Sequence, residues 1–190
     1  MLKTVSNDNQ LKLKTREFKM SKVKLQSVRL SFPSLFQQAA FGGESTGKYE
    51  ATFILDKREH VDAIAQIEAE IARIQKDEIK SKVASDKVCL KDGDDMGRPE
   101  YEGKMTIKAS TKKRPLVIDR DKSPITEDDN IVYAGCYVNA IVTLWGQNNQ
   151  FGKRVNAQLD GVQFVRDGEP FGDGGISADA FDAFGDDEEF

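Results

Sequence analysis

A long alternating run, Ile131–Trp145, restricts the architecture more than any other part of this sequence. In its second half one parity is wholly apolar, comprising Val138, Ala140, Val142 and Leu144. The other parity mixes polar residues with an aromatic residue near each end, Tyr137 and Trp145. Alternation with a period of two predicts a strand that buries one face. Gly135 would permit a bend, as where a small barrel turns a corner.

Shorter strands are predicted at Val23–Phe32, Lys48–Leu55, Lys104–Ser110 and Phe151–Val165, with a short apolar run at Leu116–Ile118. In the first of these the apolar parity switches near Gln26 and Ser27, which predicts a bulge that bends the strand. The residues Gly146–Asn149 are typical of a turn, and Asp160–Gly161 of either a tight turn or a bulge. Loops are expected at 34–47 and 81–103.

One amphipathic helix is predicted from Glu59 to about Lys80. Isoleucines recur with 3-4-3 spacing and share one helix face: Ile64, Ile67, Ile71 and Ile74. Asp56, three residues before Glu59, is typical of a capping box. Five strands and one helix, without βαβ alternation, indicate a mainly β fold. We expect a five-stranded antiparallel barrel that carries one helix.

The charge distribution separates the chain into three parts. The chain holds 32 acidic and 28 basic residues, and nine of the acids but none of the bases follow Arg166. The remaining 23 acids and 28 bases make residues 1–166 mildly basic. We expect a polar, disordered leader at 1–20, a folded domain at 21–166, and a Gly-rich linker with a disordered acidic tail at 167–190.

Enzyme chemistry finds little support in the sequence. The chain has one histidine, His60, and two distant cysteines, and it lacks the motifs of hydrolases, P-loop enzymes and zinc sites. The acidic stretch around Asp92 does not follow the calcium-loop template, so no metal and no cofactor are expected. The weakest alternative is a Mg²⁺ nuclease that would use loop carboxylates: Asp119, Asp121, Asp128 and Asp129.

Location can also be anticipated from the sequence. No apolar run reaches the length of about 18 residues that spans a membrane, and the N-terminus lacks the pattern of a secretory signal. Two cysteines far apart are typical of reduced thiols in the cytosol. We therefore expect a cytoplasmic protein that does not contact membranes.

Nucleic-acid binding is the chemistry that the residues favour. Between Lys104 and Lys122 there are seven basic and two acidic residues. Cations that follow a phosphate backbone, combined with aromatic rings that stack on bases, are what sequence-tolerant binding of single strands requires. The cations expected to meet phosphates are Lys104, Lys108, Lys112, Lys113, Arg114, Lys153 and Arg154. The rings expected to stack on bases are Tyr137, Trp145, Tyr49 and Phe151, although Tyr137 or Trp145 could instead close the end of the barrel core.

The acidic tail suggests a competitor for the same site. Its negative charges resemble a run of phosphates, and its terminal ring resembles a stacked base. On a flexible linker the tail would reach a high effective concentration near its own groove. When DNA fills the groove, the freed tail would dock on partner proteins. The residues expected to act in this way are Phe181, Phe184, Asp186, Asp187, Glu188, Glu189 and Phe190. A simple solubility aid is the alternative.

Three segments resemble a known family. They are YAGCYVNAIVTLW (Tyr133–Trp145), KASTKKRPLVIDRD (Lys108–Asp121) and LDGVQFVRDGEPFG (Leu159–Gly172). They are similar to phage-encoded single-stranded DNA-binding proteins long catalogued as a domain of unknown function, over about Ser21–Gly172. The acidic tail that ends in Phe is similar to that of the DNA-binding protein of short-tailed coliphages, and more loosely to the tails of bacterial single-strand-binding proteins.

The resemblance implies an OB-fold that protects single-stranded DNA in phage replication and recombination within the host cytoplasm. It also implies a tail that contacts replication proteins of phage or host. No bacterial-type tetramer signature is evident, and we expect a monomer or homodimer. Two features depart from the pattern: no Pro precedes Phe190, and the helix follows two clear strands rather than three. The alternatives are a protein that also coats double-stranded DNA, and a structural or adaptor protein that binds no DNA.

Overall fold

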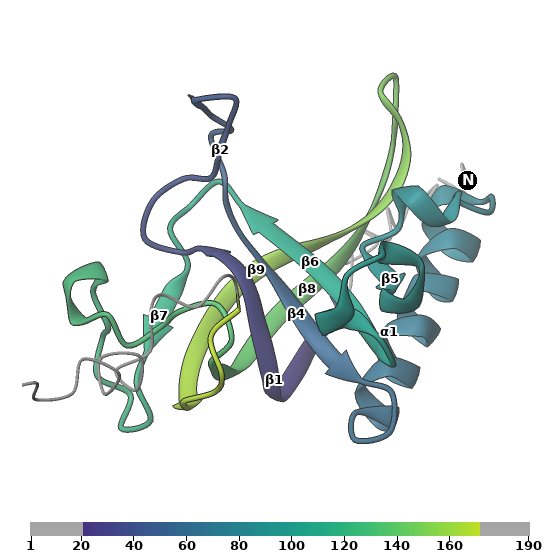
Figure 1. Ribbon diagram of the computed structural model, residues 1–190. Helices are drawn as coiled ribbons and strands as arrows, with labels where there is room; N and C mark the ends of the chain where they lie inside the picture. The colour runs from purple at the N-terminus through teal and green to yellow at the C-terminus, as the bar shows by residue number, and fades with distance from the viewer. Residues whose placement is uncertain (1–20, 172–190) are drawn as a thin grey trace, which may run out of the picture.

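Five strands close into a barrel in the computed structural model, which describes residues 21–171 (Figure 1). They are β1 (Ser21–Ser34), β4 (Tyr49–Asp56), β6 (Lys104–Thr111), β8 (Tyr137–Asn149) and β9 (Gly152–Arg166). The pairs β6–β4, β4–β1, β1–β8 and β8–β9 are antiparallel. A parallel pairing of β6 with β9 closes the barrel. The predicted five-stranded barrel is confirmed, and its closing pair is parallel.

The barrel is filled by the alternating apolar faces of its strands. In β1 the inward residues change parity, from Val23 and Leu25 to Val28 and Leu30, and all four are buried. The register against β8 shifts between Leu25 and Val28, and Ser27 has a φ of +50°. The predicted bulge is thus confirmed, and it lets one strand bend around the barrel while it keeps apolar side chains inside.

The structure corrects both ends of the strand expected at Ile131–Trp145. β8 begins only at Tyr137, because Gly135 sits in a turn with a φ of +111° and donates its N–H to the Leu30 carbonyl at 2.7 Å. A Cβ at this glycine would lie 2.2 Å from the Glu169 carbonyl oxygen. At its other end β8 runs through the residues expected to form a turn, Gly146–Asn149.

The extended end of β8 forms an arm with the start of β9. Asn149 pairs with Gly152, so the hairpin turn lies at Gln150 and Phe151 instead. β9 is the longer strand of the pair, with 15 residues against 13. Further along, the register slips by one residue between Ile141, which pairs with Gly161, and Val142, which pairs with Leu159. Asp160 therefore lies in a bulge, which decides between the two alternatives left open by the sequence.

The predicted helix begins later in the chain than expected. α1 spans Val61–Arg73 and continues as a π-helical turn, η1 (Ile74–Ile79). Asp56 does not cap it: its carboxylate accepts the N–H groups of Arg58 and Glu59 in the turn before the helix. His60 occupies the N-cap position, and its Nδ1 accepts the Asp56 N–H at 2.9 Å. The predicted isoleucine stripe is confirmed, since Ile67, Ile71 and Ile74 are buried against the barrel core.

Both expected loops contain short elements. Residues 34–47 include a small hairpin of β2 (Ala40–Phe41) and β3 (Glu44–Ser45). Residues 81–103 include β5 (Leu90–Asp92), which pairs with β6, and three 3₁₀ turns: η2 (Ser85–Lys87), η3 (Gly93–Met96) and η4 (Pro99–Tyr101). β7 (Leu116–Ile118) pairs in parallel with β9, and the turn η5 (Glu127–Asp129) follows it.

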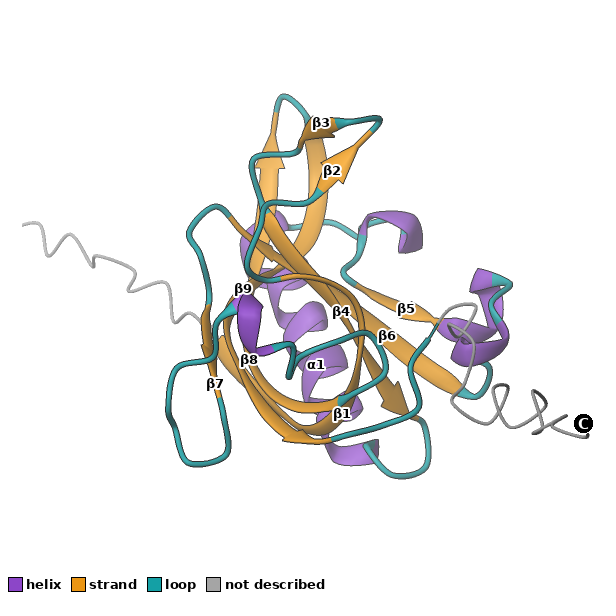
Figure 2. Ribbon diagram, turned by 60° about the vertical axis from the view of Figure 1, so that its left-hand side comes forward, coloured by secondary structure: helices purple, strands orange, loops and turns teal. Residues whose placement is uncertain are grey.

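Two hairpins project from the same side of the barrel. Figure 1 shows the β2–β3 hairpin and the tip of the β8–β9 arm above the C-terminal end of β6, and both also lie at the top of the barrel in Figure 2. Within residues 21–171, no helix is long and apolar enough to cross a membrane. The expected leader at 1–20 and the acidic tail beyond Phe171 lie outside the described residues.

Candidate nucleic-acid interface

A groove follows the line where β6 meets β9. Two adjoining hollows share three residues of these strands, Ser110, Asn156 and Ala157. One hollow extends towards Trp145 and the end of β6, and the other towards Thr52 and the β5 region. We call the two together the seam groove. Its lining includes Lys48, which follows the β2–β3 hairpin, and Trp145 of β8, which continues into the β8–β9 arm.

Positive charge dominates the lining of the seam groove. Asp86 is the acid among its lining residues. Its cations are all exposed, and they come from the loop before β4, the β5 region, β6 and β9: Lys48, Lys87, Lys91, Lys108, Lys112, Lys113 and Arg154. Since these side chains reach the groove from separate segments, the fold concentrates charge that the sequence spreads over about a hundred residues. An extended polyanion is the ligand that such a lining suits.

Trp145 supplies a flat apolar surface at the same place. It lies on β8 opposite Asn156 of β9, and 42% of its surface is exposed. Its neighbour Leu144 points inward and is 2% exposed. The alternation of β8 therefore turns the indole outward, and the alternative in which Trp145 closes the core is wrong. Lys112 and Lys113 line the same hollow as the indole, which brings a stacking surface and two cations together.

The two projecting hairpins carry exposed phenylalanines. Phe151, which the sequence analysis selected, is 76% exposed at the tip of the β8–β9 arm. Phe41, which it did not select, is 87% exposed in the β2–β3 hairpin. The signal for Phe41 was the Gly42–Gly43 pair that follows it, where both φ angles are positive and a tight turn holds the ring away from the barrel.

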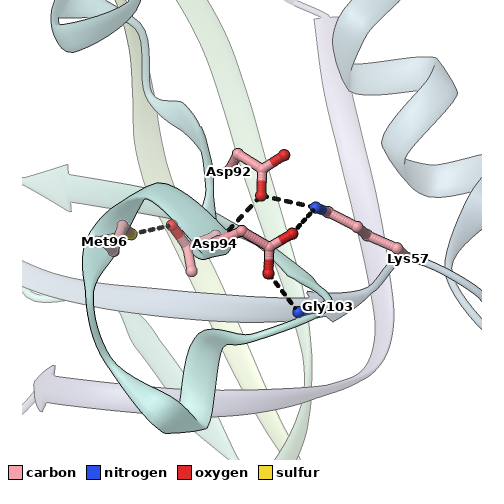
Figure 3. A network of polar contacts seen from close by, with 6 residues as sticks. Lys57, Asp92, Asp94, Met96 and Gly103 are labelled. Atoms are coloured by element: carbon pink, nitrogen blue, oxygen red, sulfur yellow. Dashed lines mark hydrogen bonds and ion pairs between the residues drawn. The ribbon is translucent and has the colours of Figure 1, made fainter.

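The edge of the groove is formed by the loop at 93–103, which a polar network holds in place (Figure 3). The Lys57 ammonium donates to Asp92 at 2.6 Å and to Asp94 at 2.7 Å, and the Gly103 N–H donates to Asp94 at 2.7 Å. These bonds raise the pKa of Lys57, through Asp92 first, and lower the pKa of Asp94, through Lys57 first. The network fixes the loop that carries Met96, whose sulfur accepts the Thr106 hydroxyl at the groove edge.

Most of the carboxylates considered as metal ligands have other partners. Asp92 and Asp94 pair with Lys57, as described above. Asp121 accepts the Ser123 hydroxyl and N–H, and Asp129 accepts the Thr126 N–H, and these bonds lower the pKa of both carboxyls. Asp119 accepts the N–H of its neighbour Arg120. Over residues 21–171, no three His, Cys, Asp or Glu side chains converge in a way that could hold a metal ion.

Two of the cations expected on β6 are paired with acids of β4. The Lys104 ammonium contacts the Asp56 carboxylate directly opposite it, outside the seam groove. That hydrogen bond is the main reason that the pKa of Asp56 falls to about 2. Lys108 does line the groove, but its ammonium lies 2.9 Å from Glu50. The line of free cations expected along β6 is therefore partly neutralised.

Tyr137 lies away from the groove. Eight residues separate it from Trp145, which corresponds to about 26 Å along a strand. The Arg166 guanidinium covers its ring at 3.5 Å, and Arg29 lies 5.8 Å from the ring centroid. Gly168 also packs against the ring, where an added Cβ would approach within 2.9 Å. These contacts leave little of the ring surface for a base.

The remaining residues selected from the sequence do not line the seam groove. Arg114 stacks over Phe36 at 5.6 Å, and Lys153 donates to the Ser81 hydroxyl at 2.8 Å. Tyr49 is half-buried and pairs with Thr111 at the end of β6. The structure thus gathers Trp145, Lys108, Lys112, Lys113 and Arg154 in the groove and adds three lysines that the sequence analysis missed: Lys48, Lys87 and Lys91.

Comparison with known proteins places the chain in a family. The family model for the ssDNA-binding protein of Enterobacter phage Enc34 matches residues 21–190. This chain belongs to the Enc34 ssDNA-binding protein family. A curated relative, the putative protein p50 of Acyrthosiphon pisum secondary endosymbiont phage 1, is 42% identical over 172 residues, which cover 85% of this chain and 92% of that protein. The family resemblance seen in three segments of the sequence is confirmed.

Two solved structures share the barrel. The single-stranded DNA-binding protein from bacteriophage Enc34, in complex with ssDNA, is 33% identical with a TM-score of 0.71, over 80% of this chain and 89% of that chain. The gp2.5 single-stranded DNA-binding protein of bacteriophage T7 is 17% identical with a TM-score of 0.51, over 90% of this chain and 98% of that chain. At that identity T7 gp2.5 shows the fold alone. The OB-like barrel implied by the family resemblance is confirmed.

Proposed function

We propose that this chain binds single-stranded DNA along the seam groove without regard to base sequence. The observation that carries the proposal is the convergence of Trp145 with exposed cations from four segments along one line of the barrel. Membership of the Enc34 family, and the complex of the Enc34 protein with ssDNA, support single-stranded DNA as the ligand.

The chemistry of the lining suggests how the strand is held. Lys112 and Lys113 neutralise phosphates beside Trp145, while a base stacks on the indole and contributes about 1–3 kcal/mol. Lys108 and Arg154 continue the positive track on the other side of Ser110. Ammonium groups and an indole face offer no pattern that distinguishes one base from another, so the binding is sequence-independent. It is also steeply salt-dependent, because each neutralised phosphate releases counterions.

The two hairpins extend the contact surface on either side. Phe151 and Phe41 stack on bases of the strand where it passes from the seam groove between the two hairpins. Lys48, Lys87 and Lys91 add phosphate contacts along its walls. Tyr137, Lys104, Arg114 and Lys153 have lesser roles in this proposal, because none of them lines the seam groove.

In the cell, this activity would protect single-stranded DNA during phage DNA replication and recombination in the host cytoplasm. The role is binding rather than catalysis. The acidic tail at 172–190 competes with DNA for the groove and recruits replication proteins of the phage or host when DNA displaces it. Its charge and its terminal Phe190 support this part of the proposal.

Fluorescence anisotropy of a labelled oligo-dT of about 30 nucleotides, compared with a matched duplex, tests the proposal. Wild-type protein should prefer the single strand, and the double variant K112Q/K113Q should bind it about tenfold more weakly. The salt slope of the double variant should fall by about 0.7 for each phosphate that is no longer neutralised. The control R120Q/K122Q removes the same number of charges from two exposed cations outside the groove, and it should behave as wild type.

Other outcomes would favour the alternatives. Equal affinity for duplex and single strand would indicate a protein that also coats double-stranded DNA. No binding of either at low salt would contradict the proposal and favour a structural or adaptor protein. An equal loss of affinity in the control and in the double variant would show that only overall charge matters, and would remove the groove as the binding site.

A further inference from the structure

The end of β1 carries an exposed aromatic ring in an unusual backbone conformation. Phe32 is 53% exposed and has a φ of +45°, in the left-handed region that bulky residues rarely adopt. The pairing of β1 with β4 shifts register between Ser31 and Ser34, so the ring is presented by a bulge. Bulges re-aim side chains and are frequent beside functional sites. The local backbone is thus arranged to hold a phenylalanine out of the core.

An arginine stacks on this ring from a separate loop. The Arg98 guanidinium carbon lies 4.8 Å from the centroid of the Phe32 ring. The Arg98 side chain is 49% exposed, and its contact with Glu100 is long, at 3.5 Å. The pair therefore presents a planar surface and a positive charge together, and both remain accessible to solvent.

The surrounding contacts hold both partners rigidly. The hydroxyls of Tyr101 and Ser31 lie 2.9 Å apart and are buried, which ties the loop of Arg98 to the strand residue that precedes Phe32. On its other side the same loop is anchored by the contacts of Lys57 with Asp92 and Asp94 (Figure 3). A site that is fixed before its ligand arrives loses less entropy on binding.

The pair borders the seam groove at the end away from Trp145. Thr52 lines the groove and is the register partner of Ser31, next to Phe32 in the chain. Met96 lines the groove two residues before Arg98. Paired strands lie about 4.8 Å apart. A strand that leaves the groove over Thr52 and Met96 therefore meets the Phe32–Arg98 pair next.

We propose that Phe32 and Arg98 form a second nucleotide-binding station that extends the single-strand path beyond the seam groove. This inference rests on the proposed function. The ring and guanidinium accept one unpaired base by stacking, and the positive charge of Arg98 attracts the adjoining phosphate. A paired base inside a duplex has no free face to offer, so the station selects for single strands. It acts only on strands long enough to reach it.

The test compares oligo-dT of about 5 nucleotides with oligo-dT of about 16, the range of site sizes for one OB fold. Phe32→Leu and Arg98→Gln should each weaken binding of the longer strand by at least about fivefold, the lower limit for removing one stacked base. Neither should change binding of the short strand at the groove. Phe32→Trp keeps an aromatic face and should restore the affinity. Leu116→Ala, an exposed apolar residue of β7, is the control and should bind as wild type.

The outcomes separate this inference from the function on which it rests. If wild-type protein binds both lengths and the two variants match it at both, the station is overturned while the groove stands. Equal losses of affinity at both lengths would also overturn it, because they would reflect damage to the groove. If wild-type protein binds neither length, the proposed function itself fails. Arg98→Gln changes an exposed side chain, so it remains informative if Phe32→Leu fails to fold.

Discussion

Whether a single residue of this barrel can bind DNA depends on whether neighbouring side chains leave it available. Lys108 faces the seam groove, but Glu50 on the neighbouring strand lies 2.9 Å from its ammonium. Tyr137 has an aromatic ring, but Arg166 already covers it. Trp145 is left half-exposed beside two lysines. The value of a side chain for binding therefore depends on contacts across strands, which lie far apart in the sequence.

The pairing of Lys108 with Glu50 leads to a prediction at the residue scale. Glu50→Gln removes a negative charge beside the groove and frees Lys108 for a phosphate, so affinity for oligo-dT should rise about two- to threefold at low salt. In the double variant E50Q/K108Q this gain should be largely absent. A double-mutant cycle measured by anisotropy isolates the pair. Unchanged or weaker binding by Glu50→Gln would show that Lys108 does not meet DNA.

At the scale of elements, cross-strand ion pairs help to fix the register of β4 and β6. Asp56 and Lys104 are directly opposite in this ladder, and their hydrogen bond holds the pKa of Asp56 at about 2. A carboxyl whose pKa is lowered by folding stabilises the folded state at pH values above its unfolded pKa, near 4. That contribution disappears as the pH falls through about 2.

Asp56→Asn tests this pair. The amide keeps an oxygen to accept the Arg58 N–H but removes the charge opposite Lys104. At pH 7 the variant should be less stable by about 1 kcal/mol, a value reduced for partial exposure to solvent. The difference from wild type should shrink between pH 4 and pH 2 in urea unfolding followed by circular dichroism. A difference that stays constant over this range would mean that packing, rather than charge, explains the lower stability.

The elements that the sequence predicted well are those with strong local patterns. The isoleucine stripe of α1 and the parity switch of β1 each depend on residues a few positions apart. The errors arose where distant contacts decide the structure. Gly135 was expected to bend a strand, but its close approach to Glu169 places it in a turn. The polar residues 146–149 were expected to turn, but they pair with β9 as one side of the arm.

The contrast between local patterns and distant contacts also explains which residues of the candidate site were predicted. Trp145 was selected from a strand pattern, and Lys112 and Lys113 from the concentration of basic residues after a predicted strand. The fold brings all three to one hollow. Lys87 and Lys91 belong to the β5 region, whose pairing with β6 is not evident from its sequence. The neutralising partners of Lys104 and Lys108 lie on β4 and become visible only in the register of that ladder. The concentration of basic residues in the sequence therefore located the groove but did not identify all of the residues that line it.

At the scale of the whole molecule, the position of the C-terminal segment decides whether the acidic tail can reach the groove. Residues after β9 run back over the barrel: the Phe171 ring lies 4.2 Å from Arg29, and its N–H donates to the Ala134 carbonyl. This point is near the start of β8, whereas Trp145 is about 26 Å further along the strand. The 19 residues that follow Phe171 span up to about 65 Å when fully extended. They are long enough to reach the groove of the same chain.

Removal of residues 172–190 tests the competing tail. The shortened protein should bind oligo-dT more tightly, and duplex binding that is too weak to measure with the full chain should become measurable. A tethered competitor lowers the affinity of every ligand for the groove, so its removal raises them all. Adding the isolated tail peptide should lower the affinity again, although only at about millimolar concentration. Affinities equal to those of the full chain for both ligands would contradict competition and leave the tail as a solubility aid.

The most direct test of the central claim uses the intrinsic fluorescence of Trp145, the chain's one tryptophan. Unlabelled oligo-dT of about 30 nucleotides is titrated into the full-length protein at low salt, and its affinity is measured in parallel by anisotropy of a labelled copy. We predict strong quenching that saturates with the binding curve and reverses as salt is added. Tight binding that leaves Trp145 fluorescence unchanged would place the DNA elsewhere and contradict the seam groove as its binding site.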